Sequence, residues 1–218
     1  MTTLITMAPA GSMELRADWA QECRESAAGQ AQHVTLVAED FFSGREKTYT
    51  YGGIVACLDW DDRLTPGAVS ACEKAMESTK AGLAFTWQRR IGSEGEDLGA
   101  ACNPVSRRML GSLPDSVHHL ACIRTEYLPR DLLPVFKAVA PLCIDWLVKA
   151  YVALKFGAVQ VPMVGYEWRQ HPDQASRKLA PEYRDQVPRA RAMIRTWLPT
   201  GIEQTHDFPI WGGLEKGG

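Results

Sequence analysis

An apolar run that ends in a cluster of acidic residues constrains this chain more than any other feature. Residues Ile54 to Leu58 are apolar, and Asp59, Asp61 and Asp62 follow within four positions. The run is typical of a short buried strand, so the acids are expected at its carboxyl end, where open α/β sheets bind their ligands. Because like charges this close repel one another, the pattern indicates a divalent cation among them.

The same acids also permit a simpler interpretation. Aspartate oxygens are hard ligands, which suit Mg²⁺ or Mn²⁺ bridging to a diphosphate better than they suit zinc. The alternative is a solvated acidic turn in which Asp61 or Asp62 caps the helix expected to open at residues 65–67. Short aspartate pairs are common by chance, so the surrounding segments must decide between the two.

The segments before this run alternate between strand and helix. The patterns predict a strand over Thr3–Ala8, a helix over Glu14–Ala28 and a second strand over His33–Ala38, which also ends in acids, Glu39 and Asp40. Strands joined in this βαβ order run parallel, so both groups of carboxylates are expected at one edge of a sheet.

The remaining segments continue the alternation. The expected elements are a helix from 65–67 to Ser78, a strand over Leu83–Ile91 with a hairpin return after residues 92–99, a short helix over Ser106–Leu113, a strand over His118–Ile123, helical material over Pro129–Val139, a helix over Pro141–Phe156, a strand over Ala158–Val164 and a basic, partly helical stretch over 175–199. The prediction is a single-domain α/β fold over residues 1–199, with a mixed, mostly parallel sheet flanked by helices, and a glycine- and proline-rich tail over 200–218.

Composition narrows the class of protein. A chain of 218 residues with 45% hydrophobic and 23% charged residues can bury the core of one globular domain. Its formal net charge of −2 supplies no global basic field for nucleic acid. No apolar run approaches the roughly 20 residues of a membrane span, and the start lacks a secretory signal, so we expect a cytoplasmic protein. The six cysteines are scattered without a C-x-x-C pair, which predicts reduced, buried thiols.

The order of these segments resembles the GT-A nucleotide-sugar glycosyltransferases, particularly the family 2 type. In that family a strand ending L-D-x-D-D is followed by a leucine and a proline-started helix, as in residues 58–68 here. The resemblance implies a GT-A (Rossmann-like) fold in which Asp59 and Asp61 bind Mn²⁺ or Mg²⁺ and the diphosphate of a nucleoside-diphosphate sugar. It also implies that Asp40, with Glu39 beside it, contacts the nucleoside.

Two later segments extend the resemblance. Residues 143–151 are similar to the family's acidic helix start, where Asp145 would be the catalytic base, although Ile144 stands where the family usually carries glutamate. Residues 166–172 resemble the Y-x-x-R-x-H-P ending, in which His171 would complete the metal shell. Taken by themselves, Asp145 is also explained as a helix-start acid and His171 as a histidine in a surface loop.

Further donor contacts are predicted around these motifs. Pro9 follows the first strand, Trp60 can stack a sugar or a base, and Arg169 opens a basic stretch that can clamp a diphosphate. For the stretch from Arg169 to Arg195, an ordinary solvated helix face with internal ion pairs is the favoured interpretation.

The chain departs from the family in one connection. Only nineteen positions separate Asp40 from Asp59, where the family usually inserts another helix and strand. This predicts an unusually open donor site, or a nucleoside held by other groups such as Arg45 or Lys47. We also expect a minimal catalytic core, without the long carboxyl-terminal extensions of many relatives.

The sequence therefore predicts a metal-dependent, inverting glycosyltransferase with a UDP-sugar as the favoured donor. Asp145 would take a proton from an acceptor hydroxyl, which attacks the anomeric carbon in a single displacement. The sequence does not identify the acceptor; a saccharide and a nucleic acid with a hydroxylated base are the two candidates. Two alternatives stay open: a nucleotidyltransferase, although residues 9–12 supply little of its glycine-rich basic loop, and a non-catalytic nucleotide-sugar-binding or assembly protein.

Overall fold

The computed structural model describes residues 2–9, 12–38, 49–101, 117, 120–174 and 180–197. Several predicted features lie outside these ranges: Glu39, Asp40, Arg45 and Lys47, the short helix over 106–113, His118 and His119, and the tail over 200–218.

The described elements follow the predicted alternation. The strands are β1 (Thr2–Pro9), β2 (Gln32–Ala38), β3 (Ile54–Asp59), β4 (Arg63–Leu64), β5 (Leu83–Ile91), β6 (Asp97–Ala101), β7 (Ala121–Arg124) and β8 (Ala158–Arg169). The helices are α1 (Ser12–Leu15), α2 (Ala17–Ala27), α4 (Ala68–Thr79), α6 (Leu133–Val139), α7 (Ile144–Phe156) and α9 (Ala180–Trp197), with 3₁₀ turns η2 (Thr125–Tyr127), η3 (Arg130–Leu132) and η4 (Pro141–Cys143).

The strands form one mixed sheet in the order β2-β1-β3-β7-β5-β8-β4, with β6 paired to β5. Strand β1 pairs in parallel with β2 and β3, β5 pairs in parallel with β8, and β7 runs antiparallel to both β3 and β5. Strands β1, β2, β3, β5 and β8 therefore point in one direction, so their carboxyl ends lie at a common edge. The prediction of a mixed, mostly parallel sheet flanked by helices is confirmed.

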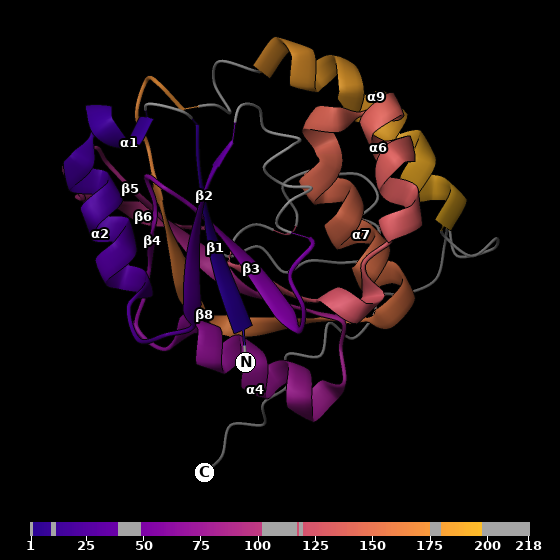
Figure 1. Ribbon diagram of the computed structural model, residues 1–218, viewed down its shortest axis with the longest axis horizontal. Coiled ribbons are helices and arrows are strands. Elements are labelled where there is room, and N and C mark those ends of the chain that lie inside the picture. Colours follow the sequence, from indigo (N-terminus) through magenta and orange to yellow (C-terminus); the bar gives the residue numbers. More distant parts are fainter. Residues whose placement is uncertain are drawn as a thin grey trace.

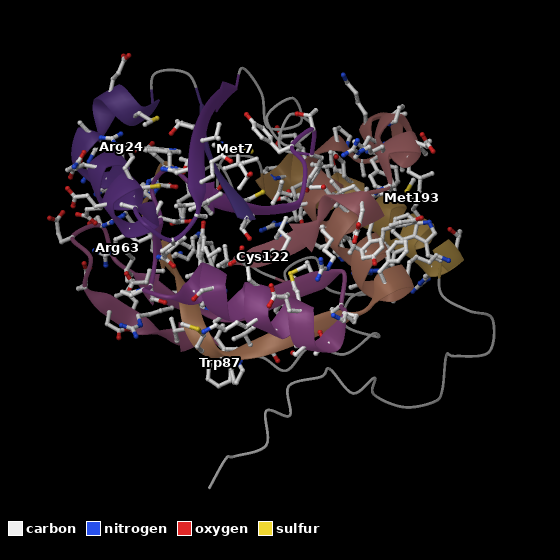
Figure 2. The ribbon with its side chains drawn as sticks, turned by 60° about the horizontal axis from the view of Figure 1, so that its bottom comes forward. Met7, Arg24, Arg63, Trp87, Cys122 and Met193 are labelled. Carbon is white, nitrogen blue, oxygen red and sulfur yellow. The ribbon has the colours of Figure 1, made fainter. Side chains whose placement is uncertain are left out.

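Helices cover both faces of this sheet (Figure 1), with α2 on one side of the strands and α6, α7 and α9 grouped on the other. Successive strand residues alternate between two cores, as the pleat requires. Ile5 and Val55 pack into the core that α6, α7 and α9 share, whereas Leu4 and Ala56 pack into the core of α2 and α4. Figure 2 labels Cys122, a residue of the second core, beside α4.

Two predictions from composition can be compared with these elements. The described cysteines, Cys23, Cys57, Cys72, Cys122 and Cys143, are all buried, as predicted. Burial raises the pKa of the Cys23 thiol to about 12, so it is an uncharged core residue at neutral pH. No helix in the described ranges is long and apolar enough to cross a membrane.

Strand β8 is longer than predicted. It continues past the expected end at Val164 to Arg169. Its register against β5 shifts beside Trp87, and Gly165 lies at this irregularity. A Cβ atom on Gly165 would lie 2.7 Å from Cβ of Thr86, so only glycine permits this approach of the two strands. The Gly165 carbonyl accepts a 3.2 Å hydrogen bond from the Thr65 N–H, which fixes the segment just after the acidic turn.

Replacing Gly165 by alanine should therefore destabilise the protein by about 1–3 kcal/mol, because the new methyl group overpacks the β5–β8 contact. Gly52→Ala is the matched control: a Cβ there meets nothing within 4 Å. Urea unfolding of both variants measures the effect. Equal stability of the two variants would contradict the role given to Gly165.

Candidate functional site

The acidic turn lies at the common carboxyl edge of the parallel strands. The Asp62 N–H donates to the Asp59 carbonyl over 3.1 Å, which closes a tight turn directly after β3. The Trp60 N–H donates to the Met7 carbonyl over 3.2 Å and ties this turn to the end of β1. The acids thus lie at the carboxyl end of a buried strand, as the sequence predicted.

Asp61 and His171 meet at this edge, although 110 positions separate them in the sequence. Nε2 of His171 lies 2.8 Å from Oδ2 of Asp61. Both side chains are largely buried, with 6% of His171 and 13% of Asp61 exposed. Strand β8 ends two residues before His171 and carries the imidazole to the acidic turn. The structure therefore brings together two of the three predicted metal ligands.

The chemistry of this pair fits a divalent cation. Adjacent ligands about 2.1 Å from an octahedral ion are about 3 Å apart, close to the separation of these two atoms. Within the described residues, no three His, Cys, Asp or Glu side chains are grouped so as to hold an ion by themselves. Ions such as Mg²⁺ commonly take one or two protein ligands and complete their shell with substrate phosphates and water. Asp59, the third predicted ligand, stays a prediction.

Asp62 has a structural place in the turn. Its carboxylate, 2% exposed as a residue, accepts 2.7 Å hydrogen bonds from the Tyr166 hydroxyl and from the Arg169 N–H. Burial, with the nearby charges of Asp61 and Asp59, raises the pKa of Asp62 well above its usual value. The alternative role as a helix cap does not hold for α4, which begins at Ala68 after Gly67 and has no side-chain cap.

Arg169 holds the turn together from the other side. Its side chain is 0% exposed, and its Nε–H donates to the Asp61 carbonyl over 2.8 Å. Nη1 donates to the Ser93 carbonyl over 2.9 Å, and Nη2 forms a 2.6 Å ion pair with Glu22. A guanidinium enclosed in this way presents no surface to a ligand in this conformation. The predicted contact of Arg169 with the donor stays a prediction.

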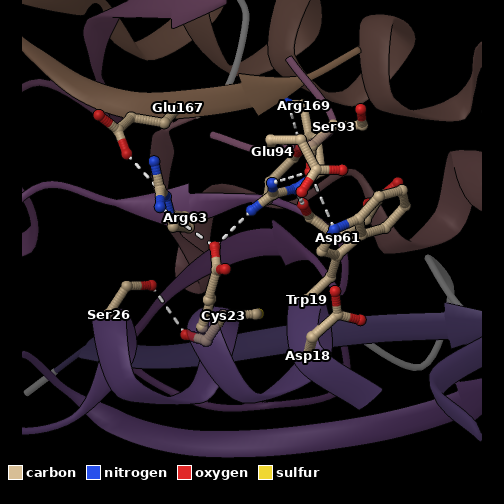
Figure 3. Close-up of polar contacts among 12 residues, drawn as sticks. Asp18, Trp19, Cys23, Ser26, Asp61, Arg63, Ser93, Glu94, Glu167 and Arg169 are labelled. Atoms are coloured by element: carbon tan, nitrogen blue, oxygen red, sulfur yellow. Dashed lines mark hydrogen bonds and ion pairs between the residues drawn. The ribbon is translucent and has the colours of Figure 1, made fainter. Parts of the chain in front are cut away.

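Helix α2 contributes residues that the sequence reasoning did not assign to the site. The Trp19 ring lies 4.8 Å from the His171 ring and 6.3 Å from the Trp60 ring. Figure 3 shows Trp19 beside Arg169 and Asp61, and Arg63 reaching from Glu167 towards the same helix. The regular spacing of Trp19 with its helix neighbours indicated only a buried helix face. No local sequence signal linked Trp19 to His171.

Asp145 lies in the first turn of α7, as predicted. The hydroxyl of buried Tyr49 donates to Oδ1 of Asp145 over 3.3 Å. One helical turn later, Lys149 is also buried, and its Nζ donates to the Val117 carbonyl over 3.4 Å. The described contact thus connects the predicted base to Tyr49.

Pro9 is the last residue of β1, in register with Ala38 of β2. The backbone of Pro9 therefore reaches the same edge as the acidic turn. Glu39 and Asp40, which directly follow β2, lie outside the described residues, so their roles stay predictions.

Comparison of the sequence with protein-family models and with curated proteins finds no match. Among solved structures, S. aureus TarS 1-349, a GT-A glycosyltransferase, superposes with a TM-score of 0.56 over 89% of this chain at 12% identity. The chain has a GT-A-like fold. Structures of TarS 1-349 in complex with UDP-GlcNAc and with UDP are similar at TM-scores of 0.55, with 10% and 13% identity over 88% and 89% of this chain. The chain spans 65% of TarS 1-349 in the first superposition, and 66% and 65% in the other two.

The hydroxyl of Tyr166, near the end of β8, holds the end of β3 in place. It accepts a hydrogen bond from the Asp59 N–H over 3.1 Å and donates one to Asp62. Tyr166→Phe should destabilise the protein by about 1–3 kcal/mol, because the buried Asp62 side chain and the partly buried Asp59 N–H each lose a hydrogen bond. Tyr127→Phe is the control, since the half-buried Tyr127 ring stacks on Phe156 and its hydroxyl makes no hydrogen bond within the described chain. Thermal or urea unfolding checks this, and a loss no greater than in the control would refute it.

Proposed function

We propose that this protein transfers a sugar from a nucleoside-diphosphate sugar, with a UDP-sugar as the donor, to an acceptor hydroxyl. The observation that carries the proposal is the Asp61–His171 pair, whose ligand atoms lie 2.8 Å apart at the carboxyl edge of a GT-A-like fold. In such folds that edge is where ligands bind. The structure of TarS with UDP-GlcNAc, a protein of the same fold, supports the choice of donor.

Asp61 and His171 would hold Mn²⁺ or Mg²⁺, with Asp59 as a further oxygen ligand. A cation bound there would neutralise the charge that develops on the departing diphosphate. The imidazole of His171 favours Mn²⁺ over Mg²⁺, because Mg²⁺ prefers oxygen ligands. Trp60, half-buried beside this pair, and Pro9, at the end of β1, would contribute to the donor site, with Glu39 and Asp40 as the proposed nucleoside contacts.

Asp145 is the proposed catalytic base. In a single displacement, its carboxylate takes the proton of the acceptor hydroxyl as that oxygen bonds to the anomeric carbon and the bond to the diphosphate breaks. One displacement inverts the anomeric configuration. The hydrogen bond from Tyr49 to Oδ1 would fix the orientation of the carboxylate for this transfer.

The acceptor in this proposal is a saccharide hydroxyl or a hydroxylated base of a nucleic acid. Helix α9 exposes Arg184, Arg189 and Arg195, but it also exposes Glu182 and Asp185. A face of mixed charge gives no strong preference for a polyanion over a neutral saccharide. The identity of the acceptor is therefore the least constrained part of the proposal.

The metal site can be tested by calorimetric titration of UDP in the presence of Mn²⁺. Removing even an outer-shell partner of a metal site costs about 10–100-fold in affinity, so Asp61→Asn should cost at least about 100-fold. Asp97→Asn, on the exposed β6 hairpin, is the control and should bind as the wild type does. Unchanged Mn²⁺-dependent binding by the Asp61 variant would refute the site.

The base can be tested separately from the donor site. Asp145→Asn should lower the rate of sugar transfer, or of slow donor hydrolysis, by about 10²–10⁴-fold, while the affinity for UDP with Mn²⁺ stays the same. Asp131→Asn, exposed in η3, is the control. Donor binding without turnover in the wild type, and no change in the variant, would instead indicate a non-catalytic nucleotide-sugar-binding protein.

A further inference from the structure

Helix α2 contacts His171 directly and Asp61 through Arg169, although it contributes neither member of the Asp61–His171 pair. Trp19 packs against the His171 ring, and Glu22 binds the arginine that holds the Asp61 backbone. We propose that Trp19 and Glu22 are positioning residues for the cation site, each fixing the orientation of one ligand. The metal part of this inference rests on the proposed function.

Trp19 is itself held firmly, which qualifies it to orient another ring. The residue is 3% exposed, and its Nε1–H donates to the Ser93 carbonyl over 3.1 Å. Its ring meets the His171 ring at a 4.8 Å centroid distance and a 54° tilt, a favourable geometry for an aromatic pair. The imidazole is thereby confined between the Trp19 ring and Asp61, which lies at Nε2. Rotation of His171 away from Asp61 would break the ring contact as well as the hydrogen bond.

Glu22 acts on the other ligand through Arg169. The Arg169 guanidinium is 0% exposed, so its charge requires a counter-charge, which Glu22 provides over 2.6 Å. With its charge balanced, Arg169 donates from Nε to the Asp61 carbonyl over 2.8 Å. This bond fixes the main chain from which the Asp61 carboxylate projects. The chain of contacts thus runs from α2 through β8 to the acidic turn.

Both contacts matter for affinity, because metal binding is sensitive to the groups that orient its ligands. Loss of such an outer partner typically weakens metal binding about 10–100-fold, even when every ligand is retained. The arrangement also explains why Trp19 and Glu22 lie one helical turn apart. Residues at positions i and i+3 share one face of a helix, and this face of α2 lies against the end of β8.

The orienting role can be measured without any metal. The ring ¹⁵N and ¹H signals of His171, assigned with a His171→Gln variant, report whether Nε2 is held at Asp61. We expect these signals to move towards those of an unrestrained imidazole in Trp19→Leu and in Glu22→Gln. Trp19→Phe, which keeps an aromatic ring, should restore them. The controls Glu25→Gln, exposed on α2, and Trp197→Leu, at the end of α9, should leave them unchanged.

Folding must be established for each variant by circular dichroism. Glu22→Gln removes the counter-charge of a buried arginine and is the variant at greatest risk of unfolding. The Trp19 variants keep both Glu22 and Arg169, and Trp19→Phe also keeps a ring near the Arg169 guanidinium, which lies 5.1 Å from the Trp19 ring centroid. The Trp19 series therefore decides the aromatic half by itself. Unchanged His171 signals in folded Trp19→Leu and Glu22→Gln would overturn the inference.

Titration with MnCl₂ then separates this inference from the proposed function. In a wild type that binds Mn²⁺, Trp19→Leu and Glu22→Gln should each weaken binding about tenfold, and Trp19→Phe by much less. If Trp19→Leu and Glu22→Gln both bound Mn²⁺ with wild-type affinity, the positioning role would be overturned. A wild type that binds no Mn²⁺ would refute the metal site, whereas the metal-free His171 signals would still decide whether α2 orients the pair.

Discussion

The buried ends of β3 and β8 are joined by Asp62, and the candidate site depends on that connection. The Asp62 carboxylate accepts from the Tyr166 hydroxyl and from the Arg169 N–H, both over 2.7 Å. A buried carboxylate is costly unless such donors compensate for lost solvation. Because the two strands are locked together here, the residue before Asp62 and the histidine two positions after Arg169 meet at hydrogen-bonding distance. Asp62, the least exposed acid of the turn, thus has a structural role, and its more exposed neighbour Asp61 is the proposed metal ligand.

Much of the fold could be predicted from local sequence patterns. The alternation of apolar strands and helices, the acids at the end of β3 and the glycine after α7 all depend on a few neighbouring residues, and the structure confirms them. The end of β8 could not be predicted in this way. Residues 166–169 are mostly polar or amphipathic, and they extend the strand because β4 and β5 pair with them on either side. Their conformation is determined by partners about 80–100 positions away.

The site was predictable only in part for the same reason. The pairing of Asp61 with His171 followed from a resemblance in motif order, not from any property of the two residues alone. Trp19 and Glu22 had no such motif, and their contacts with His171 and Arg169 depend on how α2 packs across the sheet edge. For Arg169, the local sequence and the observed contacts differ. A basic residue in a basic stretch suggests a phosphate contact, whereas the observed side chain is fully buried and bonds Glu22 and the Asp61 carbonyl.

The central claim is that Asp61 and His171 bind a cation together with a nucleoside diphosphate. A crystal structure of the protein grown with MnCl₂ and UDP, with anomalous diffraction to locate manganese, tests this most directly. The account predicts one manganese bonded to Oδ of Asp61 and Nε2 of His171, with oxygens of the UDP diphosphate completing its shell. UDP bound elsewhere, or manganese bound to other residues while the Asp61–His171 hydrogen bond stays intact, would contradict it.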